Sequence, residues 1–382
     1  MVLRPALGGA YNHVADLSAA LAERGYEVLV CGPLAERADD LGVEVVELDI
    51  VRPVSPWRDL RAVVGFTRVV RHVRPNLIHA HGSKGSLVAR LARPAAPSVP
   101  VVCTPHLYPF DNYFASAAER SMYRLVERAL APLASRVIGV CESERLLAAE
   151  VGPAGRTRLV YNGIAPVEPG PVHPAVEQLS ALGPVIGALA EFRESKGIRT
   201  LIEAMPAVLA EVPDARLAIA GDGTERPLLE SQIEALRLDD SVRLIGATEG
   251  PSPLLSGCEV FVNPAWAEAF PYTILEAMTL GMPIVATDVG GSGEAVEDEV
   301  TGRLVPPHDA GRLARAIVDL LRDPAHAREL GRAAANRYGE RFTVERMVDG
   351  VCSVYAELGI QLAPGASAGM ETEISRRGRP GG

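Results

Sequence analysis

The sequence predicts an α/β protein with two successive domains, each built on a doubly wound parallel sheet, and three observations support this. Short apolar runs that suit buried strands alternate with amphipathic helical segments along most of the chain. Residues 166–174 are rich in proline and glycine, which is typical of a linker. The length of 382 residues suits two domains of ordinary size. We therefore expect a first domain over residues 1–165, a hinge over 166–174 and a second domain over 175–340.

In the first domain we expect a first strand reduced to residues 2–3, and further strands over residues 27–31, 43–48, 76–80, 100–104, 136–140 and 158–161. Helices are expected over residues 12–24, 59–74, 86–92 and 115–134. Residues 81–85 follow a buried strand directly and precede a helix, so we expect them to form a loop.

In the second domain the expected strands are residues 185–190, 216–220, 242–245, 260–262, 284–287 and 303–305. A helix over residues 271–280 follows the fourth of these strands. A last helix over residues 343–358 lies in a separate C-terminal segment, residues 341–360. Residues 361–382 contain glycine, serine and arginine in quantity, and we expect them to be a disordered tail.

Composition narrows the classes of function. The formal net charge of −10 at pH 7 does not indicate a nucleic-acid partner. Five cysteines are scattered without a C-x-x-C pair, which favours a reducing cytoplasm over a disulfide framework. No apolar run approaches the length of a membrane span, and the N-terminus lacks the apolar core of a signal peptide. We therefore expect a cytoplasmic protein.

The most informative stretch is residues 263–281. Pro271 suits the first position of a helix, and Gly281 with Pro283 ends that helix. The first N–H groups of such a helix are free, so together with the helix dipole they form a site for an anion such as phosphate. Glu268 precedes the helix and Glu276 lies within it, so both carboxylates could accept hydrogen bonds from ligand hydroxyls. A ligand with both phosphate and hydroxyl groups is a nucleotide-sugar.

The spacing from Glu268 to Glu276 matches the Glu-x7-Glu motif of the retaining nucleotide-sugar glycosyltransferases of family 4, and residues 281–291 resemble the segment that follows it in that family. The resemblance implies the GT-B fold, in which two Rossmann-like domains face each other across a cleft and the last helix crosses back to the first domain. It also implies a hexosyltransferase (EC 2.4) of polysaccharide or glycoconjugate biosynthesis. The donor would be UDP- or GDP-linked, and no cofactor is expected.

The resemblance also assigns roles to residues. Thr104-Pro-His106 resembles the active-site histidine motif of the family, so His106 and Glu268 are the catalytic candidates. Glu268 would bind hydroxyls of the donor sugar, and Glu276 the ribose. Lys196 matches the lysine of the family's Arg…Lys-Gly segment, whose cations hold the diphosphate and remove the need for a metal ion.

One position departs from the family pattern. The residue five places before the lysine is usually arginine, and here it is Glu191. We expect a turn at Phe192 to direct Glu191 outward and to bring Arg193 beside Lys196. The full set of expected donor-binding residues is Gly9, Arg193, Lys196, Gly221, Asp222, Ala269, Phe270, Pro271, Tyr272, Thr273 and Glu276.

The expected acceptor side of the cleft contains His13, His81 and Lys84. Lys84 could hold an acceptor phosphate or be an ordinary exposed lysine. His79 and His81 lie two apart on a strand and so share a face, but we find no third ligand near them in the sequence and expect no metal site.

Two other functions remain open. A nucleotide-sugar 2-epimerase shares the fold and needs no acceptor, although the Lys-Gly and Glu-x7-Glu pairing argues against it. The departure at Glu191 leaves open an inactive nucleotide-sugar-binding partner subunit. The acceptor could be a sugar or a lipid-linked molecule. The helix over residues 59–74 carries four arginines between apolar residues, so it could dock on the inner face of the plasma membrane or be a core helix with a basic edge.

Overall fold

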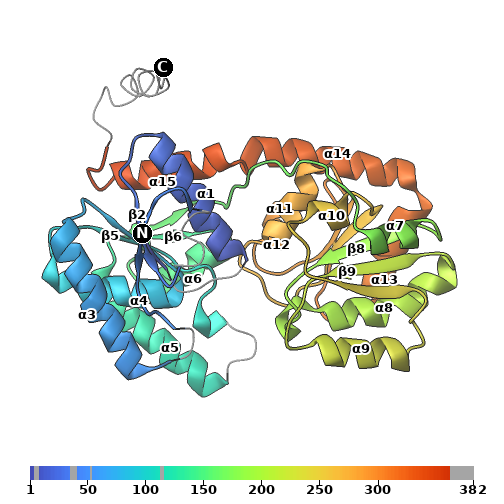
Figure 1. The fold of residues 1–382 in the computed structure, drawn as a ribbon, viewed down its shortest axis with the longest axis horizontal. Coiled ribbons are helices and arrows are strands. Elements are labelled where there is room, and N and C mark those ends of the chain that lie inside the picture. Colours follow the sequence, from blue (N-terminus) through green and yellow to red (C-terminus); the bar gives the residue numbers. More distant parts are fainter. Residues whose placement is uncertain (4–7, 35–40, 52–53, 112–115, 362–382) are drawn as a thin grey trace, which may run out of the picture.

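The computed structural model describes residues 1–3, 8–34, 41–51, 54–111 and 116–361. The chain forms two α/β lobes that lie side by side (Figure 1). We call the lobe that contains the first sheet the first domain and the lobe that contains the second sheet the second domain. The predicted tail lies outside the described residues from position 362 onward.

The first sheet has seven parallel strands in the order β3-β2-β1-β4-β5-β6-β7. These strands are β1 (Val2–Leu3), β2 (Leu29–Gly32), β3 (Glu44–Glu47), β4 (Ile78–His81), β5 (Val101–Thr104), β6 (Arg136–Gly139) and β7 (Thr157–Leu159). The second sheet has six parallel strands in the order β10-β9-β8-β11-β12-β13. These are β8 (Val185–Leu189), β9 (Arg216–Ala220), β10 (Val242–Gly246), β11 (Val260–Asn263), β12 (Ile284–Thr287) and β13 (Arg303–Val305). The predicted fold class is confirmed.

Helices cover both faces of each sheet. In the first domain they are α1 (Gly9–Glu23), α3 (Pro56–Val73), α4 (Gly82–Ala92), α5 (Ala117–Leu130) and α6 (Glu142–Val151). In the second they are α7 (Pro174–Ser180), α8 (Ile198–Glu211), α9 (Arg226–Ala235), α10 (Ser252–Leu255), α11 (Tyr272–Thr279), α12 (Ser292–Ala295), α13 (Ala310–Arg322) and α14 (Pro324–Arg341), followed by α15 (Val344–Ala356). Short 3₁₀ turns are η2 (Arg93–Ala95), η3 (Pro109–Asp111), η4 (Ala131–Leu133), η5 (Ala154–Arg156) and η6 (Glu194–Lys196).

The strands are almost continuously apolar because helices bury them from both sides. In the second domain, α8 and α13 form one core layer with β8, β9 and β11, while α11 and α14 contribute to the layer on the opposite face. In the first domain, α3 and α4 cover one face of the sheet. The other face packs against α1 and α15, so the C-terminal helix completes the first domain although it follows the second in sequence. Each fully buried large aliphatic side chain in these layers contributes roughly 1.5–3 kcal/mol.

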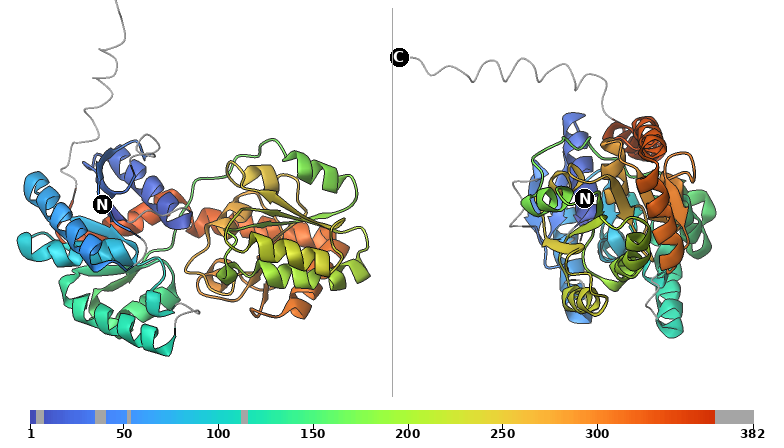
Figure 2. Two further views of the ribbon diagram at one scale, coloured as in Figure 1. Left: turned by 60° about the horizontal axis from the view of Figure 1, so that its bottom comes forward. Right: turned by 90° about the vertical axis from the view of Figure 1, so that its right-hand side faces the viewer.

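The chain passes between the lobes twice, through the linker and through the C-terminal helices (Figure 2). The two crossings run side by side, because Ile164 N–H donates to Phe342 O at 3.0 Å and Ile164 pairs with Thr343 in a parallel bridge. Gly163 permits this approach: a Cβ at this position would lie 2.0 Å from the carbonyl oxygen of Thr343. The hinge is therefore a pair of adjacent segments rather than one flexible linker.

Two predicted boundaries are corrected. Helix α4 begins at Gly82, directly after β4, so residues 82–85 form its first turn and not a loop. Pro271 has φ −76° and ψ 119°, so it is the extended N-cap of α11 and the helix starts at Tyr272. The proline ring fixes φ but not ψ, so it suits both positions. Among the described residues, no helix is both long and apolar enough to cross a membrane.

Candidate active site

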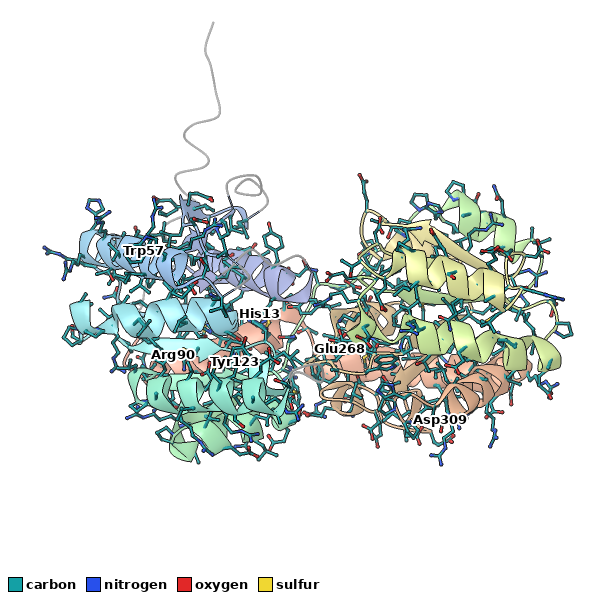
Figure 3. All side chains as sticks on the ribbon, turned by 90° about the horizontal axis from the view of Figure 1, so that it is seen from below. His13, Trp57, Arg90, Tyr123, Glu268 and Asp309 are labelled. Atoms are coloured by element: carbon teal, nitrogen blue, oxygen red, sulfur yellow. The ribbon has the colours of Figure 1, made fainter. Side chains whose placement is uncertain are left out.

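A cleft of about 1440 Å³ lies between the domains and is lined by both of them. The residues after β4 and β5 reach it from the first domain, and those after β8 and β11 from the second, as expected for the carboxyl ends of parallel strands. Figure 3 shows His13 and Glu268 near the junction of the two lobes, on opposite sides of it. The chain contains two lysines, Lys84 and Lys196, and both line this cleft.

On the second-domain wall, Lys196 Nζ donates to Glu268 Oε1, and the two side chains are 21% and 14% exposed. Lys196 ends the turn η6 after β8, while Glu268 lies in the loop between β11 and α11. Trp266 N–H donates to Ser195 O at 2.8 Å and joins the two loops. Gly197 has φ +65°, and a Cβ there would lie 1.9 Å from Pro264 O. Only glycine fits between these loops, so the backbone itself brings the lysine and the carboxylate together.

The N-termini of two helices meet beside this ion pair. Ala269, Phe270 and Tyr272 line the cleft at the start of α11, and Gly9 lines it at the start of α1. A Cβ at Gly9 would lie 3.1 Å from Cδ2 of Tyr272, so the two helix starts are in close contact. Both helix dipoles therefore favour negative charge in the same part of the cleft.

Glu276 lies one turn into α11 and is half-buried. Its Oε2 is buried, and among the described residues it has no hydrogen-bond partner. Burial, followed by the charge of Asp16, raises the pKa of Glu276 to about 7, and burial raises the pKa of Asp16 to about 6. Asp16 belongs to α1, so the contact between the two helix starts brings together two acids from different domains.

The expected turn at Phe192 is present, since Arg193 N–H donates to Glu191 O at 2.8 Å, but the expected outward direction of Glu191 is wrong. Glu191 Oε2 lies 2.9 Å from Arg193 Nε, and both residues line the cleft. Phe192 is fully buried between them, and its N–H donates to Asp222 O at 2.8 Å. This turn leaves both neighbours of the buried phenylalanine on the side of the cleft. Glu191 therefore pairs with the arginine instead of turning away from it.

Several expected donor-binding residues lie outside the set that lines the cleft. Gly221 has φ +132°, and its missing Cβ leaves room for Ala190 O. Asp222 accepts from Arg226 Nε at 2.9 Å. Thr273 Oγ1 accepts from Asn263 Nδ2 at 3.2 Å, which fixes the loop ahead of α11. Pro271 is buried as the N-cap of α11. Glu276 also lies outside the set that lines the cleft, so five of the expected donor-binding residues do not face its open volume.

On the first-domain wall, the structure brings together His13 of α1, His81 at the end of β4 and His106 after β5. One ring nitrogen of each lies within 4.8 Å of the others. His81 Nδ1 and His106 Nε2 are 3.3 Å apart. Burial lowers the pKa of His13 to about 4 and holds the pKa of His81 and of His106 well below the ordinary value. We call these three residues the histidine cluster, and it is uncharged at neutral pH.

His79 takes no part in the histidine cluster. Its Nδ1 contacts Tyr355 Oη at 2.7 Å and its Nε2 contacts Thr104 Oγ1 at 2.8 Å. Both ring nitrogens are therefore occupied, Nδ1 in holding α15 against the sheet and Nε2 in a contact with the neighbouring strand β5. Of the two histidines whose spacing suggested a shared face, His79 is structural and His81 is not.

Of the two roles left open for Lys84, the ordinary exposed lysine is not what the structure shows. Its Nζ lies 2.5 Å from Asp59 Oδ2, and the two side chains are 11% and 16% exposed. Lys84 is in the first turn of α4 and Asp59 in the first turn of α3, so the pair joins these two helices at the rim of the cleft. The charge of Lys84 is thus paired within the protein, as is that of Lys196.

Three functional contacts were missed from the sequence. Asn162 Nδ2 donates to Phe270 O at 3.3 Å, while its Oδ1 contacts His13 Nδ1 at 3.0 Å. Glu144 accepts from Leu107 N at 2.6 Å and from Val140 N at 2.9 Å. The Asn-Gly turn after β7 and an acid in the first turn of α6 were the available signals, but neither reveals a distant partner.

Glu144 supports a backbone that is strained. His106 has φ 51° and Leu107 has φ 94°, which is uncommon for consecutive residues other than glycine. Burial raises the pKa of Glu144 to about 7 despite its two backbone N–H donors. The carboxylate thus fixes the loop that presents His106 to the cleft.

The third missed contact crosses between the domains. Glu294, in the short helix α12 that follows the Gly-rich loop after β12, accepts from the backbone N–H groups of Glu142 at 2.8 Å and Ser143 at 3.2 Å. It thus caps α6 of the first domain. Gly290 and Gly291 pack against the backbone of residues 268–269, where added Cβ atoms would lie within 2.4 Å of carbonyl oxygens. The loop therefore supports the Glu268 segment from behind.

Part of the remaining first-domain wall is apolar. Met122 and Val126 of α5 line the cleft and are 49% and 42% exposed, and Leu125 of the same helix is 69% exposed. Tyr108 and Leu130 extend this surface toward the sheet. The two walls of the cleft therefore differ in chemistry.

Comparison with known proteins gives consistent matches to both domains. Residues 8–163 match the family described as "Glycosyl transferase 4-like domain", and residues 183–323 match "Glycosyl transferases group 1". The chain is 28% identical to glycogen synthase of Mycobacterium tuberculosis, over 91% of each chain. It is 27% identical to the solved sucrose-phosphate synthase of Thermosynechococcus elongatus, with a TM-score of 0.81 over 94% of this chain and 95% of that one. HepE of Anabaena, solved in complex with UDP and glucose, shares the fold at 22% identity, with a TM-score of 0.77 over 93% of this chain and 98% of that one.

Proposed function

Because the chain belongs to the family 4-type glycosyltransferases of the GT-B fold, we propose that it transfers a sugar from a nucleotide-sugar to an acceptor with retention of the anomeric configuration, without a metal ion. The observation that carries the proposal is the Lys196–Glu268 ion pair beside two converging helix N-termini. A diphosphate needs cations and N–H groups, and a sugar needs hydrogen-bond acceptors. This corner of the cleft offers all of them within one cluster.

The leaving diphosphate gains negative charge as the glycosidic bond breaks. Lys196 and the N-termini of α1 and α11 are positioned beforehand to stabilise that charge. Glu268 then exchanges its contact with the lysine for hydroxyls of the donor sugar. Glu276, whose buried oxygen lacks a described partner, accepts from the ribose. HepE contains UDP in its solved structure, which supports a UDP-linked rather than a GDP-linked donor as the first one to test.

Metal independence is supported by the kind of ligands present. Within the described part of the chain, three or more ligand-type side chains converge only in the histidine cluster. The ions that commonly accompany nucleoside diphosphates, Mg²⁺ and Mn²⁺, prefer oxygen ligands. We therefore expect that a chelator leaves transfer unchanged. Loss of activity with a chelator, restored by Mg²⁺ or Mn²⁺, would contradict the proposal.

His106 faces the transferred sugar from the first domain. Its strained backbone is held by Glu144, so its position is built into the fold. The cap that Glu294 places on α6 supports closure of the domains, which excludes water and limits donor hydrolysis. His106→Ala should reduce transfer on the order of tenfold while nucleoside diphosphate binding stays intact. Loss of nucleotide binding in this variant would move His106 to the donor site.

The apolar surface of α5 favours an acceptor with an apolar portion, such as a lipid-linked sugar, over a fully polar glycan. Such an acceptor fits a cytoplasmic enzyme that works at the inner face of the plasma membrane. Helix α3 supports this only in part, because Phe66 and Val70 belong to the core. Its exposed edge has Trp57 at 76% and Leu60 at 50% exposure, between arginines. If the protein floats with anionic liposomes but not with neutral ones, this would support a contact between α3 and the membrane.

A thermal-shift panel of nucleotide-sugars, followed by NMR of the products, tests the function. The expected result is stabilisation by one donor and, with acceptor, a product with retained anomeric configuration. An inverted product would contradict retention. Interconversion of the donor without acceptor would favour the 2-epimerase. The Glu191–Arg193 pair keeps the inactive partner subunit as a second candidate, which donor binding without turnover on any acceptor would support.

A further inference from the structure

We propose that His13, His81 and His106 form a binding site for a borderline-soft divalent cation of the Zn²⁺ type, and that the bound cation blocks sugar transfer. The three residues come from α1, β4 and the loop after β5, so the site belongs to the first domain. One nitrogen of each ring lies within 4.8 Å of the others. Three imidazoles with an open fourth position are a ligand set that zinc accepts.

Hydrogen bonding fixes the state of His13. Asn162 Nδ2 donates to Phe270 O, so the amide must present Oδ1 to the histidine. Since Oδ1 can only accept, His13 Nδ1 must carry the proton and donate to it. Nε2 is then left with a free lone pair, and it is buried with no hydrogen-bond partner among the described residues. A histidine whose second nitrogen donates to an oxygen is oriented as metal-ligating histidines usually are.

The other two rings have suitable spacing. His81 Nδ1 and His106 Nε2 are 3.3 Å apart. Two nitrogens bound to one tetrahedral zinc at the usual bond length lie about 3.4 Å apart. The rings are nearly parallel, with an interplanar angle of 23°. Little movement is needed to replace the contact between the two rings by bonds to one ion.

Access and selectivity also follow from the position of the cluster. His13 and His81 are 1% exposed, while His106 is half-buried and lines the cleft. An ion therefore enters from the cleft, and its open position faces the same side. All three ligands are nitrogen, so Zn²⁺ and Co²⁺ should bind and Mg²⁺ should not. A bound cation would engage His106, which could then no longer face the sugar. This blocking effect rests on the proposed function, whereas the binding of the cation does not.

Cobalt titration of the full chain tests the site without any enzyme assay. The expected result is the visible absorption of tetrahedral Co²⁺ at one equivalent, displaced by Zn²⁺ and unaffected by excess Mg²⁺. His106→Ala should weaken Co²⁺ binding at least about tenfold. His72→Ala, which changes an exposed histidine, and His326→Ala, which changes a half-buried one, serve as matched controls and should titrate like the unmodified chain. No such absorption at one equivalent, or equal binding in His106→Ala, would overturn the proposal.

X-ray absorption of the zinc-loaded, unmodified chain avoids variants that fail to fold. Three imidazole ligands are expected, and an oxygen-dominated shell would overturn the site. In a transfer assay, one equivalent of Zn²⁺ should inhibit and a chelator should restore the rate. Zinc binding without inhibition would overturn the blocking role alone. If no donor supports transfer at all, the proposed function fails while the cobalt result still decides the metal site.

Discussion

The two walls of the cleft use opposite chemistry. The second-domain wall carries formal charges, Lys196 with Glu268 and Arg193 with Glu191, and these pair with each other. The first-domain wall carries the uncharged histidine cluster beside the apolar surface of α5. The lysine of the first-domain wall, Lys84, is neutralised at the rim by Asp59.

The difference shows how each wall is prepared for a ligand. On the charged wall an incoming diphosphate must compete with carboxylates for the cations, so part of the binding energy is used to rearrange pairs that already exist. On the histidine wall the groups are held by contacts to the backbone and to Asn162, and no charge has to be displaced. Substitutions on the first kind of wall should therefore alter electrostatics, and substitutions on the second kind should alter geometry.

The largest effect is expected for Lys196→Ala. Removing a cation that pairs with both Glu268 and the leaving diphosphate should cost roughly 3 kcal/mol of transition-state stabilisation, about 150-fold in kcat/KM. Lys84→Ala is the matched control, since it removes the second lysine of the same cleft. It should leave the KM for donor unchanged. Equal losses in both variants would contradict the division between the walls.

Glu268→Gln should reduce kcat/KM by roughly 10- to 150-fold, equivalent to about 1.5–3 kcal/mol for a charged hydrogen bond. The amide cannot accept from sugar hydroxyls with both of its polar atoms. Steady-state kinetics, with thermal unfolding to confirm the fold, provide the measurement. An unchanged kcat/KM would remove Glu268 from the site.

A smaller effect concerns the two acids that meet where the walls join. The pKa values of Asp16, about 6, and Glu276, about 7, are raised, so the folded chain binds more protons than the unfolded chain between about pH 4 and 7. These groups therefore make the free energy of unfolding fall as the pH rises through that range. Asp16→Asn should be more stable than the unmodified chain at pH 8 by roughly 1 kcal/mol, and equal to it at pH 4.

Urea unfolding at both pH values measures this effect. Glu23→Gln changes an exposed acid of the same helix and should show no such difference. Because each variant is compared with the unmodified chain at the same pH, the contribution of the histidines to the free energy of unfolding cancels. Lower stability of Asp16→Asn at pH 8 would show that the folded protein stabilises the ionised carboxylate of Asp16 instead of destabilising it.

The smallest effect is expected at the Glu191–Arg193 pair, whose side chains are 47% and 37% exposed. Exposed pairs of this kind contribute about 0.2–1 kcal/mol. Arg193→Ala should raise the KM for donor a few-fold and lower kcat, and Glu191→Ala should be neutral or mildly activating because it frees the arginine. Loss of activity in Glu191→Ala with Arg193→Ala silent would reverse the assignment.

The sequence by itself determined the alternation of strands and helices, and strands such as Arg216–Ala220. It also pointed to the stretch around Glu268 and to Lys196, because motif spacing and local periodicity are written along the chain. Such features depend on backbone sterics and on near neighbours, so one segment is enough to reveal them.

Only the tertiary structure decided which of these groups meet. Lys196 and Glu268 are 72 residues apart, and His13 and Asn162 are 149 apart. Each pair lies within one domain, and its contact depends on strand order, which brings segments from distant parts of the chain to the same edge of a sheet. The same physics explains the error at Glu191, because the turn at Phe192 was expected but the burial of Phe192, which leaves both of its neighbours on the cleft side, was not. Burial in a core is a property of the whole fold, and no pattern within three residues encodes it.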